Sequence, residues 1–238
     1  MKERYVHLTP RLIAALSMLK GAAVVADIGC DHGRLTAALL QQNICARVIA
    51  TDISEPSLQK AKDLLGHVSL SDRVSFRAGD GLDPLSENEC DAIAILGMGG
   101  TLMTRILSRC KMPLNGASCI VLQPMRAQTE IREYLYRNQY RITDDRIIRE
   151  HDRLYQIFRA ESDTSLQPWP DGFPKDFFEV GYLSFLHQDP ELNALCESQI
   201  CILNKQLKNA CGSIGEEKLR LRIEAYEQII SHISRKQV

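Results

Sequence analysis

Short apolar runs alternate with amphipathic segments along the chain, and this alternation is the strongest constraint on its fold. Five apolar runs have the length of buried strands, at residues 22–28, 47–53, 73–77, 92–96 and 118–123. Apolar residues at three- and four-residue steps predict helices between and after them, at residues 34–42, 56–65, 102–110 and 129–138. Such alternation is typical of a parallel sheet with right-handed crossovers. We therefore predict a doubly wound, Rossmann-like α/β domain.

A different pattern closes this region. Residues 140–148 and 153–159 are strand-like and are separated only by a few polar residues around His151 and Asp152. A connection that short joins antiparallel strands. Five parallel strands closed by a hairpin are typical of the class I methyltransferase sheet, in which the last strand is antiparallel. A dinucleotide-binding dehydrogenase normally continues with another crossover helix.

Helices are predicted at both ends of the chain. Thr9 and Pro10 predict the start of an N-terminal helix, because threonine caps a helix and proline fits its first turn, and Gly21 ends it. Apolar stripes over residues 192–210 and 219–233, separated by a glycine-containing break at 212–215, predict a small, coiled-coil-like helical hairpin. We therefore divide the chain into a first domain at 1–160, a linker at 161–175 that contains three prolines, and a C-terminal helical domain at 176–238.

Composition excludes several protein classes. Of 238 residues, 45% are hydrophobic and 25% are charged, the balance of an ordinary globular protein, and a net charge of −1 argues neither for nor against a nucleic-acid partner. None of the eight cysteines forms a C-x-x-C pair, so we expect free thiols in a reducing cytoplasm rather than disulfides or a metal site. No apolar stretch reaches the roughly 20 residues that a membrane span needs, and we see no signal peptide.

The first two strands end in residues suited to a nucleotide-like ligand. The first runs into Asp27-Ile28-Gly29-Cys30-Asp31-His32-Gly33, where glycines allow the backbone to approach a ligand at the following helix N-terminus, although a structural turn would use them too. The second ends in Asp52 and Ile53, and a carboxylate there can accept hydrogen bonds from ribose hydroxyls. This spacing fits NAD as well as S-adenosylmethionine (SAM).

The remaining strand ends favour SAM over NAD. In SAM enzymes an acid such as Asp80, before Gly81, can accept a hydrogen bond from the adenine amino group, whereas NAD enzymes have no fixed need for an acid at this position. The alternative is that Asp80 is an ordinary turn aspartate. The fourth strand delivers Gly97-Met98-Gly99-Gly100, which leaves space for a flat base or forms a flexible turn. The fifth ends in Gln123 and Pro124, and Gln123 offers a donor and an acceptor to a base edge, or caps a helix.

Together these motifs resemble those of the bacterial tRNA adenine-N1 methyltransferases that modify adenine 22. The resemblance rests on the segments Asp27–Gly33, Ala50–Ile53, Gly79–Leu82, Gly97–Gly100 and Leu122–Pro124, and it extends over nearly the whole chain. The Asp-His pair and the Gly-Met-Gly-Gly run are specific to this family among methyltransferases. The chain departs from the family pattern in having Met125 in place of an asparagine and Arg34 where an aromatic residue is common.

The resemblance implies SAM-dependent methylation of adenine N1 in tRNA, with no metal, by a cytoplasmic monomer or weak dimer. It also implies how the site is divided. The expected cofactor-binding residues are Asp27, Gly29, Cys30, Asp31, His32, Gly33, Asp52, Ile53, Asp80, Gly81, Gly97 and Met98. The expected substrate-binding residues are Gly99, Gly100, Gln123, Pro124, Arg126, Lys205, Lys208, Lys218, Arg220 and Arg222.

Adenine N1 carries a lone pair and no proton, so methyl transfer needs no obligatory general base. An acceptor near N6 would favour the cationic product, and Asp31 is the catalytic candidate for that role; alternatively it binds the amino group of the SAM methionine. His32 orients Asp31 or caps the following helix, and we expect the cap.

The tRNA contact is expected on the C-terminal helices, since the base must be turned out of its stack and phosphate contacts would offset that cost. The alternatives are that the basic residues there form a solvated face and that Arg126, Arg132 and Arg137 hold the tRNA instead. Two other functions stay open at this stage. One is a small-molecule or protein methyltransferase with the same core, and the other is a SAM-binding module without catalysis.

Overall fold

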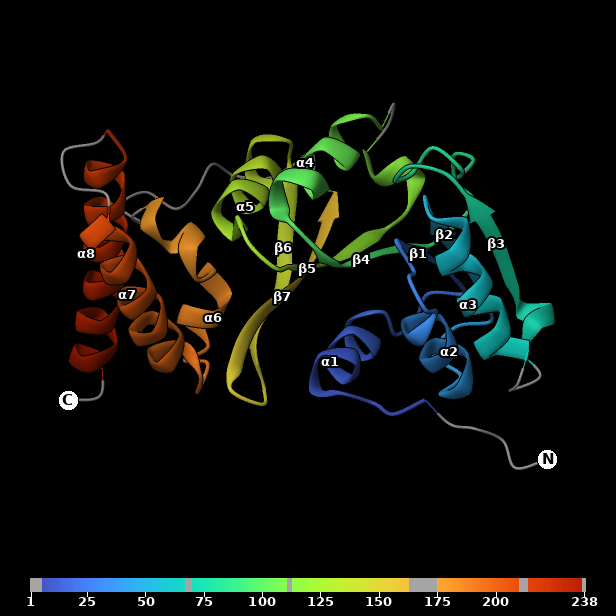
Figure 1. The fold of residues 1–238 in the computed structure, drawn as a ribbon, viewed down its shortest axis with the longest axis horizontal. Helices are drawn as coiled ribbons and strands as arrows, with labels where there is room; N and C mark the ends of the chain where they lie inside the picture. Colours follow the sequence, from blue (N-terminus) through green and yellow to red (C-terminus); the bar gives the residue numbers. More distant parts are fainter. Residues whose placement is uncertain (1–5, 67–69, 111–112, 163–174, 210–213, 237–238) are drawn as a thin grey trace.

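A seven-stranded sheet with helices on both faces forms the body of the molecule, and further helices extend from one end (Figure 1). The computed structural model describes residues 6–66, 70–110, 113–162, 175–209 and 214–236. The strands are β1 (Val24–Ile28), β2 (Arg47–Asp52), β3 (Val74–Ala78), β4 (Ala92–Met98), β5 (Cys119–Pro124), β6 (Tyr140–Glu150) and β7 (Arg153–Ser162). The helices of the body are α1 (Pro10–Met18), α2 (Arg34–Gln41), α3 (Glu55–Gly66), α4 (Gly100–Ser108) and α5 (Gln128–Arg137), with short 3-10 turns η1 (Ser71–Arg73) and η2 (Pro113–Gly116).

The strand order is β3-β2-β1-β4-β5-β7-β6, and β1 to β5 are parallel. β7 pairs antiparallel with both β5 and β6, which confirms the predicted hairpin with an antiparallel last strand. The order reverses between β1 and β4, so the crevice at the carboxyl ends of these two strands is where such sheets bind ligands.

The two faces of the sheet are buried under different helices. Val25 of β1 packs in one core with α1, α2 and α3, whereas its neighbour Ala26 packs in a second core with α4 and α5. This is the two-residue alternation of a strand that is buried on both faces. Figure 1 shows α1, α2 and α3 below the sheet and α4 and α5 above it. At the N-terminus, Thr9 caps α1 by accepting a hydrogen bond from the Leu12 backbone N–H, as predicted.

The C-terminal helices pack directly on the β6–β7 hairpin. They comprise η3 (Lys175–Glu179), α6 (Tyr182–Leu186), α7 (Leu192–Asn209) and α8 (Ile214–Lys236). Their apolar core includes Ile147 of β6 together with Phe177, Leu195 and Tyr226. The sequence predicts α7 and α8, but it gives no sign of η3 and α6. Most of the predicted linker falls at 163–174, outside the described residues, and α8 begins within the predicted break at 212–215, so the proposed boundaries stay a prediction.

A buried ion pair in the sheet body also contacts the first C-terminal element, η3. Arg132 of α5 and Asp145 of β6 lie 2.9 Å apart, and their side chains are 1% and 0% exposed. Arg132 also donates to the side chain of Gln156, at 2.6 Å, and to the carbonyl of Phe178, at 3.1 Å. Gln156 in turn donates to the Glu179 carbonyl. Because buried charges need partners on every side, this network fixes η3 against the sheet.

A second polar contact continues the network into α8. The Glu179 carboxylate accepts hydrogen bonds from Arg222 Nε, at 2.7 Å, and from the Tyr226 hydroxyl, at 2.7 Å. The Arg222 guanidinium and the Tyr226 hydroxyl hold the pKa of Glu179 below its usual value, although burial alone would raise it. A chain of polar contacts therefore runs from α5 through the hairpin and η3 to α8.

We expect Arg132→Met to lower the free energy of unfolding by about 3–5 kcal/mol, because it leaves the Asp145 carboxylate buried without its cation. Urea denaturation followed by circular dichroism measures this. The control is Arg220→Gln, which removes an exposed pair with Glu216 four residues earlier and should cost about 0.5 kcal/mol or less. Equal losses in the two variants would contradict a stabilising role for the buried pair.

Candidate active site

A cleft of about 260 Å³ opens at the carboxyl edge of the sheet, where the strand order reverses. It lies between the glycine loop after β1, the ends of β4 and β5, the start of α1 and the tip of the β6–β7 hairpin. Its lining residues are Thr9, Arg11, Leu12, Asp27, Gly29, Cys30, Asp31, His32, Arg34, Leu35, Leu96, Gly97, Gln123 and Glu150. Many of the predicted cofactor residues therefore share one cavity.

Close packing explains the two glycines of the loop. Gly29 has φ +69° and Gly33 has φ +70°, a region that favours glycine. A Cβ on Gly29 would collide with Cε of Met98, and one on Gly33 would lie 2.8 Å from Cβ of Ala61 in α3. The backbone N–H groups of Gly29 and Cys30 donate to the Thr51 carbonyl at 2.8 and 2.9 Å, which ties the loop to β2.

Asp27 lies beneath this loop and is 3% exposed. Burial raises the pKa of its carboxyl to about 6, although a hydrogen bond from Thr36 Oγ1, at 2.6 Å, opposes the shift. Asp27 is thus a carboxylate at the floor of the cleft that gains a proton as the pH falls through about 6.

Asp52 and Ile53 follow β2 at the neighbouring strand end. The Asp52 carboxylate accepts hydrogen bonds from the backbone N–H groups of Asp31, at 2.9 Å, and Ser54, at 2.8 Å, so its orientation is fixed. Ile53 is 75% exposed, which is unusual for a large apolar side chain and leaves a surface against which a flat group can pack.

Asp80 lies at the end of β3, as predicted, but it has a partner that the sequence did not reveal. Its carboxylate pairs with Arg109 at 2.7 Å, and Arg109 also pairs with Asp83. Both side chains of the Asp80 pair are 42% exposed, so the pair is screened by solvent and can exchange partners.

Asp31 occupies a strained position at the rim of the cleft. Its φ is +47°, and its side chain is 68% exposed. Nδ1 of His32 lies 2.8 Å from Asp31 Oδ2, so His32 orients Asp31. The expected helix cap is wrong, because the N-cap of α2 is Gly33 and no side chain caps it.

The ends of β4 and β5 are locked together. The Met125 backbone N–H donates to the Met98 carbonyl, and the Gly100 N–H donates to the Arg126 carbonyl, both at 2.8 Å. Arg126 packs beside Gly99 and is exposed. These contacts hold the predicted glycine run and Pro124 at one edge of the site.

Gln123 is 2% exposed, and neighbours occupy its amide. Nε2 donates to the Pro124 carbonyl at 3.3 Å, while Oε1 accepts from Arg11 Nη1 at 3.4 Å. Arg11 and its partner Glu150 also line the cleft, and sequence reasoning missed both. No local signal marks them, because positions 11, 123 and 150 meet only in the folded chain.

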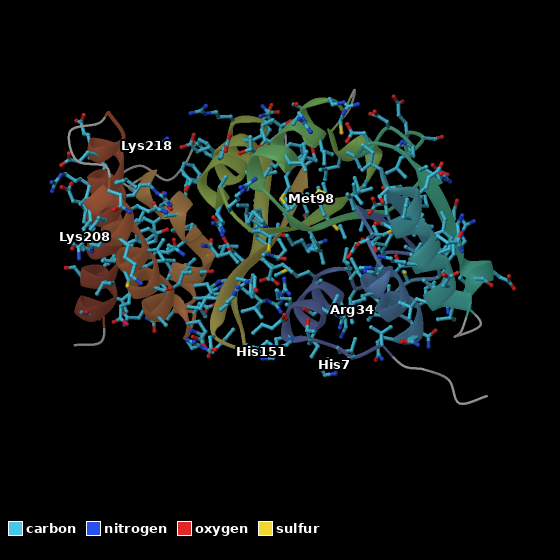
Figure 2. All side chains as sticks on the ribbon, in the orientation of Figure 1. His7, Arg34, Met98, His151, Lys208 and Lys218 are labelled. Atoms are coloured by element: carbon cyan, nitrogen blue, oxygen red, sulfur yellow. The ribbon has the colours of Figure 1, made fainter. Side chains whose placement is uncertain are left out.

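The predicted basic residues of the C-terminal helices fall into two groups. Lys205, Lys208 and Lys218 are exposed, and Figure 2 shows Lys208 and Lys218 on the C-terminal helices at one end of the molecule, whereas Met98 lies near its middle. Arg220 pairs with Glu216, whereas Arg222 is held by Glu179. Arg132, the alternative contact beyond β5, is buried with Asp145, so it has no access to a ligand.

Within the described ranges, no group of three or more histidine, cysteine or acidic side chains has the geometry of a metal site. The seven cysteines in these ranges are free thiols. None of the helices described combines the length and apolar character that a membrane crossing requires.

Comparison with known proteins agrees with this geometry. Residues 8–158 match a family model described as a methyltransferase domain. Over 155 residues the chain is 35% identical to the tRNA (adenine(22)-N(1))-methyltransferase of Bacillus subtilis (strain 168). That match covers 65% of this chain and 65% of the relative, so it spans slightly less than two thirds of the relative's length.

Solved structures extend the likeness to the C-terminal helices. The crystal structure of the B. subtilis M1A22 tRNA methyltransferase TrmK has a TM-score of 0.77 at 26% identity, covering 94% of this chain and 99% of that one. M. capricolum TrmK, solved with S-adenosyl-homocysteine, has a TM-score of 0.80 at 22% identity and covers 95% and 99% of the two chains. At 22% identity, the likeness to M. capricolum TrmK concerns the fold alone. The comparisons confirm the resemblance and the fold predicted from the sequence motifs.

Proposed function

The chain belongs to the methyltransferase-domain family, and from this premise we propose that it transfers the methyl group of SAM to N1 of an adenine in tRNA, at position 22. The observation that carries the proposal is the cleft beside the glycine loop in a chain that is 35% identical to a tRNA (adenine(22)-N(1))-methyltransferase. A tRNA substrate also places the activity in the cytoplasm.

The cofactor fits the residues at the carboxyl edge. Asp52 is oriented to accept the ribose hydroxyls, and the exposed Ile53 provides a surface for the adenine ring. Asp80 would accept the adenine amino group with Gly81 beside it, and its exposed pair with Arg109 leaves carboxylate lone pairs free to do so. The Met98 side chain packs against Gly29 and bounds the adenosine half of the cofactor site. The loop residues Cys30, His32 and Gly33, with Gly97, surround the methionine half.

Bound SAM supplies an electrophilic methyl group on a sulfonium, and the work of the protein is to hold the adenine N1 lone pair in line with it. No side chain has to remove a proton from N1. Methyl transfer moves the positive charge from the sulfonium to the purine, so acidic groups beside the ring stabilise the methylated, cationic adenine. We assign to Asp31, which His32 contacts at the rim of the cleft, a role on N6 or on the methionine ammonium.

Phosphate contacts are assigned to the exposed cations. We place them on Lys205, Lys208 and Lys218 of the C-terminal helices and on Arg126 beside the glycine run. Arg220 is partly neutralised by Glu216 and contributes less. Arg222 is left out of the proposed surface, because its guanidinium is committed to Glu179.

The direct test incubates purified protein with methyl-labelled SAM and unmodified tRNA, followed by nucleoside analysis. We expect label in 1-methyladenosine, and no label when adenine 22 is replaced by guanine. Label at another base, or transfer only to protein or small molecules, would overturn the proposed substrate.

We expect SAM affinity to fall as the pH drops through about 6, because protonation of Asp27 removes a negative charge from the cleft in which we propose that the positively charged cofactor binds. One pH unit below a pKa only about a tenth of a carboxyl is ionised, so affinity at pH 5 should be up to about tenfold lower than at pH 7. Calorimetric titration measures this. Asp27→Asn should bind more weakly at pH 7 and lose most of the pH dependence. If Asp27→Asn keeps the pH dependence of the wild type, Asp27 is not the source of that dependence.

Replacing Lys205, Lys208 and Lys218 by glutamine should weaken tRNA binding and reduce the slope of log K against log salt by about two to three. Filter binding across a salt series measures both quantities. A matched variant removes three exposed cations from other faces, Lys20, Lys60 and Arg105, and changes the net charge equally. If both variants behave alike, the effect comes from net charge and the proposed surface is wrong.

A further inference from the structure

The wall of the cleft opposite the glycine loop is formed by side chains that the cofactor motifs leave unused. Arg11 of α1 lies at its centre, with Gln123 at the end of β5 and Glu150 and Tyr155 on the β6–β7 hairpin. We call these four residues the Arg11 cluster. Three of them, Arg11, Gln123 and Glu150, line the cleft.

Arg11 contacts each of the other three residues of the cluster through its guanidinium. Arg11 Nη2 donates to Glu150 Oε1 at 2.7 Å, and Nη1 donates to Gln123 Oε1 at 3.4 Å. The Arg11 backbone N–H faces Glu150 Oε2 at 3.4 Å. Arg11 Cζ lies 4.1 Å from the centroid of the Tyr155 ring, which covers one side of the guanidinium. Three segments that are distant in sequence thus hold one flat cation in a fixed orientation.

The cluster is rigid but remains accessible from the cleft. The Arg11 side chain is 29% exposed, whereas that of Glu150 is 10% exposed. The hydrogen bond from Arg11 lowers the pKa of Glu150 to about 2, so the ion pair persists throughout the neutral range. Arg11 Nε is buried and has no hydrogen-bond partner in the described part of the chain. The guanidinium is therefore held by its outer nitrogens and by the ring.

Such a wall suits a flat, transiently cationic ring. Guanidinium planes stack on nucleic-acid bases, and the Tyr155 ring fixes the plane in advance. A lone arginine would repel a purine that becomes positive on methylation, but Glu150 compensates that charge. The residues assigned to the adenosine half of the cofactor (Asp52, Ile53, Asp80) do not line this cleft, so in our assignment that half does not fill it.

We propose that the Arg11 cluster is the wall against which the target base stacks, with Arg11 as the base-binding residue and Glu150, Gln123 and Tyr155 as the residues that position it. This inference rests on the proposed function, and it names the subsite that the RNA base occupies. Arg11 then contributes to the handling of tRNA and not to the affinity for SAM.

The experiment compares Arg11→Lys, Tyr155→Leu and Tyr155→Phe with the wild type. Lysine keeps the charge beside Glu150 but lacks the plane and the second donor nitrogen, and phenylalanine keeps the ring. We measure SAM affinity by calorimetry and kcat and KM for tRNA at saturating SAM. Arg11→Lys and Tyr155→Leu should keep SAM affinity within twofold and lower kcat/KM for tRNA at least tenfold. Tyr155→Phe, and Arg105→Lys on α4 as the matched control, should stay within twofold of the wild type.

A second readout needs no turnover. With S-adenosyl-homocysteine present, tRNA carrying 2-aminopurine at position 22 reports the base leaving its stack and meeting the wall. The wild type should change its fluorescence, and Arg11→Lys should reduce that change. Thermal melting of each variant separates loss of folding from loss of stacking. Glu150→Gln serves the same purpose, because it preserves the shape of the side chain and weakens the contact that holds Arg11.

The outcomes are distinct. If Arg11→Lys weakens SAM binding tenfold and leaves tRNA kinetics at saturating SAM unchanged, Arg11 is a cofactor ligand and the inference is overturned. It is also overturned if Arg11→Lys matches the wild type in both readouts. If the wild type makes no 1-methyladenosine, the proposed function fails, and the SAM titrations and the 2-aminopurine signal still show whether Arg11 meets a base.

Discussion

The fully buried pair of Arg132 and Asp145 is the contact on which the arrangement of the whole chain depends. Two buried charges are tolerated only when further hydrogen bonds support them, and here Arg132 finds such partners on β7 and η3. Buried polar contacts therefore anchor the C-terminal helices to the sheet. A chain cut before η3 would expose this pair, so truncation cannot separate the lysine-bearing helices from the methyltransferase domain without disturbing both.

The β6–β7 hairpin transmits this constraint to the cleft. Pairing in register sets Ile147 opposite Gln156 and Ile148 opposite Tyr155, so residues of the buried network and of the cleft follow one another along the same two strands. Asp145 and Gln156 contact Arg132 from the middle of the hairpin, whereas Glu150 and Tyr155 hold Arg11 nearer its tip. The spacing between the exposed lysines and the cleft is thus set by a stiff element and not by a linker.

The sequence predicted what depends on local pattern. Strand–helix alternation fixes the parallel sheet, a short polar turn fixes the hairpin, and the glycines and aspartates at strand ends mark the cofactor edge. It could not predict contacts between distant positions, such as Arg11 with Glu150 or Asp80 with Arg109. Helical periodicity also cannot distinguish a solvated arginine from one such as Arg222, whose partner Glu179 lies in a short turn with no pattern of its own.

The distribution of charge completes the argument. With a net charge of −1, the protein gains little overall attraction to a polyanion, so binding must come from local cations. The carboxylates of Asp27 and Asp31 line the cleft at the glycine loop, and the cleft also carries a compensated pair, Arg11 with Glu150. The exposed lysines lie at the far end of the molecule (Figure 2). In our proposal, phosphates are therefore held where they cannot neutralise the acidic groups around the cofactor, and only the uncharged base reaches the cleft.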